Sequence, residues 1–415
     1  MLNDYVIEPV ARERLRRRAA GIHLDPFADW LAGRRYAVAT IHSYIYAADR
    51  FMDWWTCADT SAALPPSSHT CLTDYRTYLA APGPNGVQAH DRSNSYCGAR
   101  RFLIFLQKTG FLPSSDTAHS PKTELESRFR LWLLHHRGVK SITADGYGCV
   151  IGRLLVCVGT VPGTYTAAQL RVFVLSQSQG FSRSKAETTV SAVRMFVRFL
   201  IASGECQDNL QHAIPRVAGW RQASLPRYLE HASIEQIIGN CEPSTVLGAR
   251  DRAILLLLAR LGLRAGDVAG LRLSDLDWTS GRIRVSGKSQ RSTWLPLPQD
   301  AGDAVLHYLG TARHAAEGDG VFLTTRAPYT PIITRQVSST AERAIRRAGI
   351  KAPSLGAHLF RHSAATEWLR QGLSLQAVGA VLRHQDPDTT AIYAKVDIGL
   401  LRQIAMPWPV EGSSC

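Results

Sequence analysis

The sequence predicts a mainly α-helical protein with one small antiparallel β-sheet. Apolar residues recur with helical spacing over most of the chain, in segments separated by breaks rich in proline, glycine and serine. One stretch, 281–298, instead alternates apolar and polar residues on both sides of a turn-like SGKSQRS. At 415 residues the chain is too long for a single ordinary core. We therefore expect two or three domains.

The first 115 residues predict an extra N-terminal helical module. Its helical segments are separated by SAALPPSSHT at 61–70, APGPNGVQ at 81–88 and LPSSDTAHSP at 112–121. Proline and glycine clusters of this kind end helices and mark loops. We expect the module to end at the last of these breaks.

A second helical domain is predicted over 122–212, and its sequence resembles that of the first module. The F-x-x-W-L start of 27–55 recurs in 129–156. Likewise, 99–110 is similar to 193–204. The offset is about 100 residues in both pairs, as an internal duplication would give. Two amphipathic helical segments under the same packing constraints would give the same likeness, so both explanations stay open.

The third predicted domain, 225–410, follows a breaker-rich connection at 205–226. ARDRAILLLLARLGLRAGDVAGL at 249–271 predicts a buried helix, a turn marked by glycine and a second helix. The alternation at 281–298 predicts a β-hairpin with Lys288 at or near its tip. Helical spacing returns at about residue 300 and continues to the end of the sequence.

The amino-acid composition indicates which class of molecule the protein binds. The net charge of +14 and the pI near 9.7 favour polyanions, of which nucleic acid is the commonest. The eight cysteines include no C-x-x-C pair, which argues against a zinc site or a disulfide framework and favours reduced, mostly buried thiols. We find no apolar run of the roughly 18 to 20 residues that span a bilayer and no secretory signal. A soluble, cytoplasmic protein is expected.

Six residues that could act on an anionic substrate occur in short motifs of the third domain. They are Arg264 in GLRAGD, Lys288 in SGKSQR, His358 and Arg361 in HLFRH, His384 in LRHQDPDTT, and Tyr393 in TTAIYAKV.

These motifs, in this order, resemble the catalytic domain of the tyrosine recombinase family, also called the phage integrase family. The family has an Arg in a G-L-R turn, a Lys on a β-hairpin, H-x-x-R on a helix, a His in an L-G-H-like element and a nucleophilic Tyr shortly after it. One position departs from the pattern, because Arg383 precedes His384 where the family usually has glycine. We expect this arginine either to alter the turn that presents His384 or to add a phosphate contact.

The resemblance implies that two arginines bind the phosphate under attack. A phosphodiester repels nucleophiles, and more negative charge collects on its non-bridging oxygens in the transition state. Guanidinium groups are always protonated and bind two oxygens at once. Arg264 and Arg361 would form this clamp, with Asp267 steadying it and His384 donating a further hydrogen bond.

The resemblance also assigns the proton transfers. A tyrosine phenol has a pKa of about 10, so Tyr393 must lose its proton as it attacks. His358 would assist that step, and Lys288 would protonate the leaving 5′-oxygen. The product would be a 3′-phosphotyrosyl bond, which needs neither cofactor nor metal. The sequence contains no P-loop and no carboxylate cluster suited to two-metal catalysis.

His362 is expected to lie outside this set. It follows Arg361 by one residue, so the turn of the helix directs it away from the phosphate that Arg361 would face. We expect a structural role for it, or one near the DNA.

Family members close a helical core-binding domain and the catalytic domain round a duplex. By this resemblance the fold would combine one or two helical N-terminal DNA-binding domains with a recombinase catalytic domain. Four basic side chains of the second domain are candidates for phosphate contacts: Arg183, Lys185, Arg194 and Arg198. The tail after Tyr393, with Asp397 capping a short helix, would dock on a neighbouring subunit or fold back in cis. A tetramer on two DNA sites is the implied active form.

The resemblance thus predicts a site-specific DNA recombinase that integrates or transposes a mobile element and is associated with the nucleoid. Two alternatives stay open. A type IB topoisomerase would use the same cleavage chemistry to relax supercoils, and a DNA-binding accessory subunit would work beside an active recombinase. Whether partner recombinases are required is also open.

Overall fold

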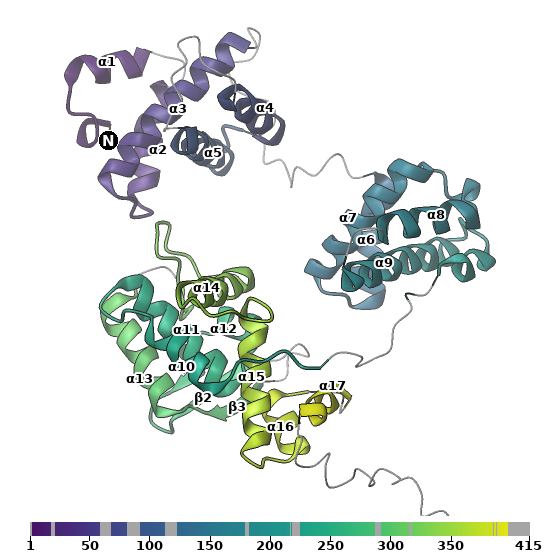
Figure 1. The fold of residues 1–415 in the computed structure, drawn as a ribbon. Coiled ribbons are helices and arrows are strands. Elements are labelled where there is room, and N and C mark those ends of the chain that lie inside the picture. The colour runs from purple at the N-terminus through teal and green to yellow at the C-terminus, as the bar shows by residue number, and fades with distance from the viewer. Residues whose placement is uncertain are drawn as a thin grey trace, which may run out of the picture. The chain divides into compact units, whose positions relative to one another are not determined.

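The computed structural model confirms a mainly helical protein with one small antiparallel sheet (Figure 1). Residues within 65–73 and 107–221 form one compact unit, and the remainder are assigned to another. The predicted three-part division stays a prediction. The described residues are 2–17, 21–58, 68–80, 92–112, 123–178, 182–215, 217, 225–286, 292–314, 318–384, 386 and 388–396.

The N-terminal helices are held together by aromatic rings. Phe27 of α2 packs edge-to-face on Phe102 of α5 at 5.1 Å between ring centroids, and Phe105 lies 5.4 Å from Phe27. All three rings are buried. Such pairs stabilise a core beyond the area that they bury. The elements are η1 (Leu2–Asp4), α1 (Pro9–Arg17), α2 (Gly21–Ala32), α3 (Val38–Ala58), α4 (Ser68–Ala80) and α5 (Arg92–Lys108).

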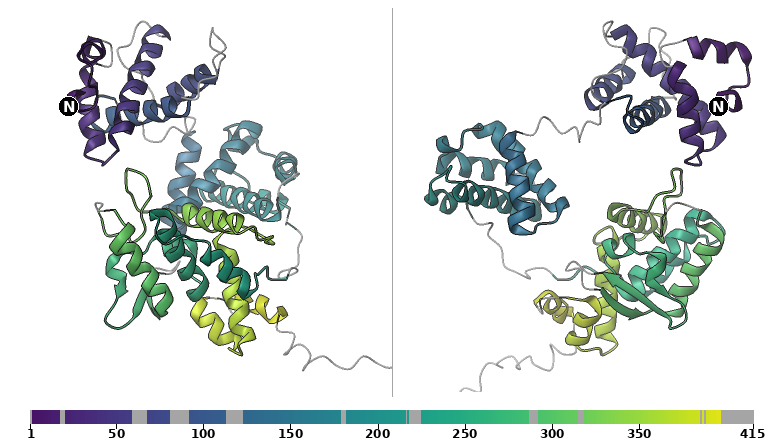
Figure 2. Two further views of the ribbon diagram at one scale, coloured as in Figure 1. Left: turned by 60° about the vertical axis from the view of Figure 1, so that its left-hand side comes forward. Right: turned by 180° about the vertical axis from the view of Figure 1, so that it is seen from behind.

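The middle part is a bundle built on one long helix, α9. Its side chains Val193, Phe196, Val197 and Leu200 are completely buried, and Phe129 of α6 meets Phe196 edge-to-face. Both views of Figure 2 show these helices packed against one another. The elements are α6 (Glu124–Arg137), α7 (Ser141–Val158), η2 (Pro162–Thr164), α8 (Ala167–Ser178), α9 (Arg183–Ala202) and η3 (Asp208–Ala213).

The segments with similar sequences lie on equivalent elements. The pair 27–55 and 129–156 runs from one helix through a turn into the next, on α2–α3 and α6–α7. The pair 99–110 and 193–204 covers the last turns of α5 and α9 and the residues just after them. This correspondence agrees with a duplication and equally with shared packing constraints.

One described helix, α7, is long and apolar enough to cross a membrane by length and composition alone, with a mean hydropathy of 1.3. The sequence prediction concerned continuous apolar runs, so this helix does not contradict it. Its residues Ile151, Leu154 and Leu155 lie in the core of the middle bundle, and Asp145 and Arg153 interrupt it. These features are typical of a helix that packs one face against a core.

The thiols are less buried than expected. Among the described cysteines, Cys71 and Cys241 are buried, whereas Cys57, Cys97, Cys149 and Cys157 are exposed. All of them are free thiols, as expected.

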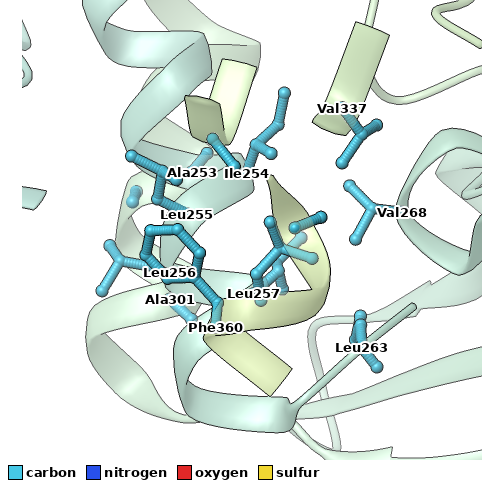
Figure 3. Close-up of a cluster of buried hydrophobic side chains, with 14 of the residues drawn as sticks. Ala253, Ile254, Leu255, Leu256, Leu257, Leu263, Val268, Ala301, Val337 and Phe360 are labelled. Carbon is cyan, nitrogen blue, oxygen red and sulfur yellow. The ribbon is translucent and has the colours of Figure 1, made fainter. Parts of the chain in front are cut away.

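The C-terminal part is organised round α11, whose residues 253–258 are all buried. Ala253 to Leu258 form an unbroken buried run, and Val268, Val337 and Phe360 pack round it (Figure 3). The continuous LLLL run in the sequence is explained by this central place, because a helical stretch that is buried all round has no polar face.

The elements of this part are α10 (His231–Gly239), α11 (Val246–Leu261), α12 (Ala265–Ala269), η4 (Leu273–Asp275), β1 (Leu276–Asp277), β2 (Arg282–Ser286), β3 (Ser292–Pro296), α13 (Gln299–His307), the π-helical η5 (Tyr308–Ala312), α14 (Thr334–Arg347), α15 (Ala357–Arg370), α16 (Leu375–Leu382), α17 (Asp388–Ala391) and η6 (Ile392–Val396).

The predicted hairpin is confirmed as β2 and β3 of a three-stranded antiparallel sheet in the order β1-β2-β3. Ile283 pairs with Leu295, and both side chains face the core. Lys288 falls between the two strands and lies outside the described residues.

Candidate active site

The predicted site forms where the ends of two helices meet α15. The buried guanidinium of Arg361 donates from Nη1 to the carbonyl of Gly262 at 2.5 Å and from Nη2 to the carbonyl of Leu382 at 2.6 Å. Gly262 ends α11 in the left-handed region at φ 56°, and Leu382 is the last residue of α16. Carbonyls at helix C-termini lack partners within the helix and carry the negative end of the dipole. Arg361 therefore neutralises two helix ends.

Arg264 lies next to this pair because it follows Gly262 after one residue. Its Nη2 donates to the carbonyl of Arg383 at 3.3 Å, so the two predicted clamp arginines bond to consecutive carbonyls, 382 and 383. Burial, reinforced by Arg264, lowers the pKa of Arg361 to about 10, which leaves it protonated at neutral pH. Burial likewise lowers the pKa of Arg264, and Asp267 opposes that change.

Asp267 and Arg383 complete the cluster. The Oδ2 atom of Asp267 accepts from the backbone N–H of Arg264 at 3.0 Å and from Nη2 of Arg383 at 2.5 Å. Arg383 has φ 56°, a conformation that favours glycine and is strained for other residues. Within the described part of the chain, its buried Nε and Nη1 atoms have no hydrogen-bond partner. The departure from the family pattern thus adds a third guanidinium beside the predicted clamp.

His384 follows directly and is half-buried. Its Nδ1 lies 2.8 Å from the hydroxyl oxygen of Thr390 in α17. Burial, followed by the charge of Arg361, lowers the pKa of His384 to about 4, so the ring is neutral at pH 7. The contact with Thr390 fixes the orientation of the ring at the edge of the arginine cluster.

Tyr393 lies on η6 and is only 2% exposed. Its ring belongs to a small buried cluster with Ala365, Leu369, Val378 and Leu382, between α15 and α16. Burial raises the pKa of its phenol to about 12, and the charge of Arg361 opposes that change.

The hydroxyl of Tyr393 lies 2.8 Å from Nδ1 of His362. The expectation that His362 stands apart from the candidate catalytic residues was therefore wrong. The turn of α15 does direct His362 and Arg361 to different sides of the helix. Arg361 contacts the end of α11. The η6 segment places Tyr393 on the side that His362 occupies. A signal was present in the sequence, because His358 and His362 are four residues apart and share a helix face.

His358 reaches solvent from the first turn of α15, and its ring centroid lies 4.3 Å from that of His362. Although its side chain is exposed, surrounding protein atoms lower the pKa of His358, and the charges of Arg361 and Arg264 lower it further. The structure thus brings five of the six predicted catalytic residues to one place, while the sixth, Lys288, lies outside the described residues.

Two of the predicted DNA-contacting side chains in the middle part have partners within the protein. Arg183 pairs with Glu187 at 2.9 Å, and Nη2 of Arg194 donates to the carbonyls of Ile214 and Pro215. Arg198 lines a polar depression beside Arg194. Contacts of these arginines and Lys185 with DNA stay a prediction.

The chemistry available to the cluster follows from its charge. Among the described residues of this cluster, the three guanidiniums of Arg264, Arg361 and Arg383 lie beside one carboxylate, that of Asp267. An excess of fixed positive charge beside a buried phenol suits an anion that the phenol oxygen can attack.

Comparisons with known proteins show which family the chain resembles. The phage integrase family profile matches residues 227–398. A Sinorhizobium fredii protein named as an integrase/recombinase, y4rA, is 33% identical over 400 residues and covers 94% of this chain and 95% of its own. Tyrosine recombinase XerC of Azotobacter vinelandii is 30% identical over 221 residues, 53% of this chain and 72% of its own.

Among solved structures, a lambda integrase tetramer bound to a Holliday junction has a TM-score of 0.52 at 18% identity. The match covers 65% of this chain and 76% of that one. It shows a likeness of fold.

Proposed function

Because the chain belongs to the phage integrase family of tyrosine recombinases, we propose that it cuts and rejoins DNA at specific sites through a 3′-phosphotyrosyl bond to Tyr393. The observation that carries this proposal is the placement of Arg264 and Arg361 on consecutive carbonyls, in one cluster with the buried Tyr393. It combines an anion site and a nucleophile.

The proposed step exchanges one phosphodiester for another. The Tyr393 oxygen forms a bond to phosphorus, and the bond from phosphorus to the 5′-oxygen breaks. Arg264, Arg361 and His384 bind the non-bridging oxygens, on which negative charge grows. His358 takes up the phenol proton, and Lys288 supplies a proton to the leaving 5′-oxygen. Rejoining is the reverse reaction with the 5′-hydroxyl of another strand. The number of phosphoester bonds therefore stays the same.

The proposed partner is double-stranded DNA, held in part by Arg183, Lys185, Arg194 and Arg198. Exchange between two duplexes requires four strands to be cut, so we propose a tetramer on two sites. The lambda integrase tetramer on a Holliday junction supports this assembly through its fold. The name of the Sinorhizobium fredii relative, an integrase/recombinase, supports a role in integration, and the proposed substrate that is integrated or transposed is a mobile element.

The test is a trapping experiment on nicked suicide duplexes drawn from the DNA that flanks the gene. The wild-type protein should form a covalent adduct, and Tyr393→Phe should form none, because phenylalanine lacks the attacking oxygen. No adduct on any candidate duplex, or one that survives the substitution, refutes the proposal.

A supercoiled plasmid without the trapped site serves as the second substrate. Relaxation of that plasmid at the rate of site cleavage would favour a topoisomerase. A wild-type protein that binds the site and cuts only when mixed with a second recombinase would favour an accessory role.

A further inference from the structure

The hydroxyl of the buried Tyr393 is tied to a residue that the proposed mechanism does not use. The oxygen lies 2.8 Å from Nδ1 of His362, and the two ring centroids are 5.5 Å apart. The two residues are 31 positions apart in sequence and come from η6 and α15. A contact of this length between a phenol and an imidazole nitrogen is a good hydrogen bond.

Packing fixes both partners of this bond. The Tyr393 ring lies against Leu369 and Leu382, so the phenol oxygen can move little without moving the ring. His362 is half-buried, and its ring lies 4.3 Å from that of His358 in an edge-to-face contact. The bond therefore sets the direction in which the hydroxyl points.

The pKa shifts of the two groups determine whether the contact is a neutral hydrogen bond or an ion pair. Burial lowers the pKa of His362 to about 4, and the neighbouring His358, Arg361 and His384 lower it in the same sense. Burial raises the pKa of Tyr393 to about 12. Both shifts disfavour transfer of the phenol proton to His362. In the protein without DNA the pair is a neutral hydrogen bond and not an ion pair.

We propose that His362 is a positioning residue for the nucleophile, whose Nδ1 hydrogen-bonds to the Tyr393 oxygen and holds that oxygen in line for attack. The proposal rests on the proposed function of Tyr393. It assigns proton uptake to His358 and orientation to His362, which explains why two histidines share one face of α15. A nucleophile displaced by about 1 Å loses on the order of 100-fold in rate.

The test is single-turnover cleavage of the nicked suicide duplex at saturating protein, with two substitutions of one side chain. His362→Asn keeps a polar atom near the position of Nδ1, whereas His362→Phe keeps a ring and removes the hydrogen bond. His362→Phe should lower the rate constant of adduct formation by about 10- to 100-fold. The dissociation constant for DNA should change less than about 2-fold, since His362 is not assigned a DNA contact. His362→Asn should recover most of the rate.

A matched pair of substitutions controls for the loss of a histidine. His231 lies exposed at the start of α10, so His231→Asn and His231→Phe should both react at the wild-type rate. Hydrogen exchange of the α15 peptide reports whether His362→Phe keeps its fold. If that peptide loses protection, His362→Leu is used in place of His362→Phe. Its rate constant of adduct formation is then compared with that of His362→Asn.

Three results overturn the inference. The first is a wild-type rate of adduct formation for His362→Phe or its replacement His362→Leu. The second is a rate for His362→Asn that is as low as the rate for that apolar variant. The third is loss of the acidic limb of the pH–rate profile in His362→Asn, because that would make His362 the proton acceptor. The variant Tyr393→Phe distinguishes failure of the proposed function from failure of the positioning role. A covalent adduct with Tyr393→Phe refutes the proposed function. No adduct with Tyr393→Phe, together with a wild-type rate of adduct formation for His362→Phe, refutes only the positioning role.

Discussion

Asp267→Asn is expected to destabilise the C-terminal part by about 3 kcal/mol, because removing one partner of a buried ion pair leaves the other charge uncompensated. The side chains of Asp267 and Arg383 are 7% and 10% exposed, and their contact is 2.5 Å long. Two nitrogens of Arg383 already lack partners among the described residues. Asparagine keeps the oxygen that accepts from the Arg264 backbone, so the loss reports the charge and not the helix cap.

The assay is hydrogen exchange by mass spectrometry at increasing urea, followed in the peptides that contain α12 and α15. It measures the free energy of opening locally, which suits a chain with more than one compact unit. Asp319→Asn is the matched control, because Asp319 pairs with Arg272 at 3.7 Å and both side chains are more than half exposed. Its effect should stay within about 0.5 kcal/mol.

The double variant Asp267→Asn, Arg383→Gly tests whether the uncompensated cation causes the loss of stability. Glycine removes the uncompensated cation and also relieves the left-handed backbone, which costs about 1 to 2 kcal/mol for other residues. We expect it to regain most of the stability lost in Asp267→Asn. A loss below about 1 kcal/mol in the single variant, or no recovery in the double one, would refute the reasoning that Asp267 holds Arg383 in place.

Three further predictions concern the same cluster. Gly262→Ala should cost about 2 to 3 kcal/mol, because the new Cβ lies 2.8 Å from Cδ2 of Leu382 at a φ of 56°; unchanged protection of α11 in hydrogen exchange would contradict it. Arg361→Lys should leave a helix-end carbonyl unpaired, costing about 1 to 3 kcal/mol, and should slow adduct formation at least about 100-fold; a wild-type cleavage rate would exclude the bidentate role. His362 and His384 have folded-state pKa values of about 4, below the ordinary 6.5, so the unfolded chain takes up protons first as the pH falls. The free energy of unfolding should drop by roughly 2 kcal/mol per histidine between pH 7 and pH 5, and substituting both by asparagine should flatten the pH dependence in urea titrations.

Local patterns predicted much of the fold because they act within a few residues. The LLLL run of α11, the glycine after it and the alternation on both sides of SGKSQRS each specify a helix, its end or a hairpin. Helix α7 shows that the length of an apolar run and the mean hydropathy of a segment are different quantities. Asp145 and Arg153 break its apolar run without lowering its mean hydropathy below that of a spanning segment.

The order of motifs in the sequence by itself determined which residues to examine and to which family they point. Only the tertiary structure decided how they meet: Arg361 pairs with the ends of two helices, Arg383 turns to Asp267, and His362 reaches Tyr393. The physical reason is that these bonds join residues 21 to 116 positions apart in the chain. Such contacts depend on how α11, α15 and α16 pack, and no local spacing records that packing.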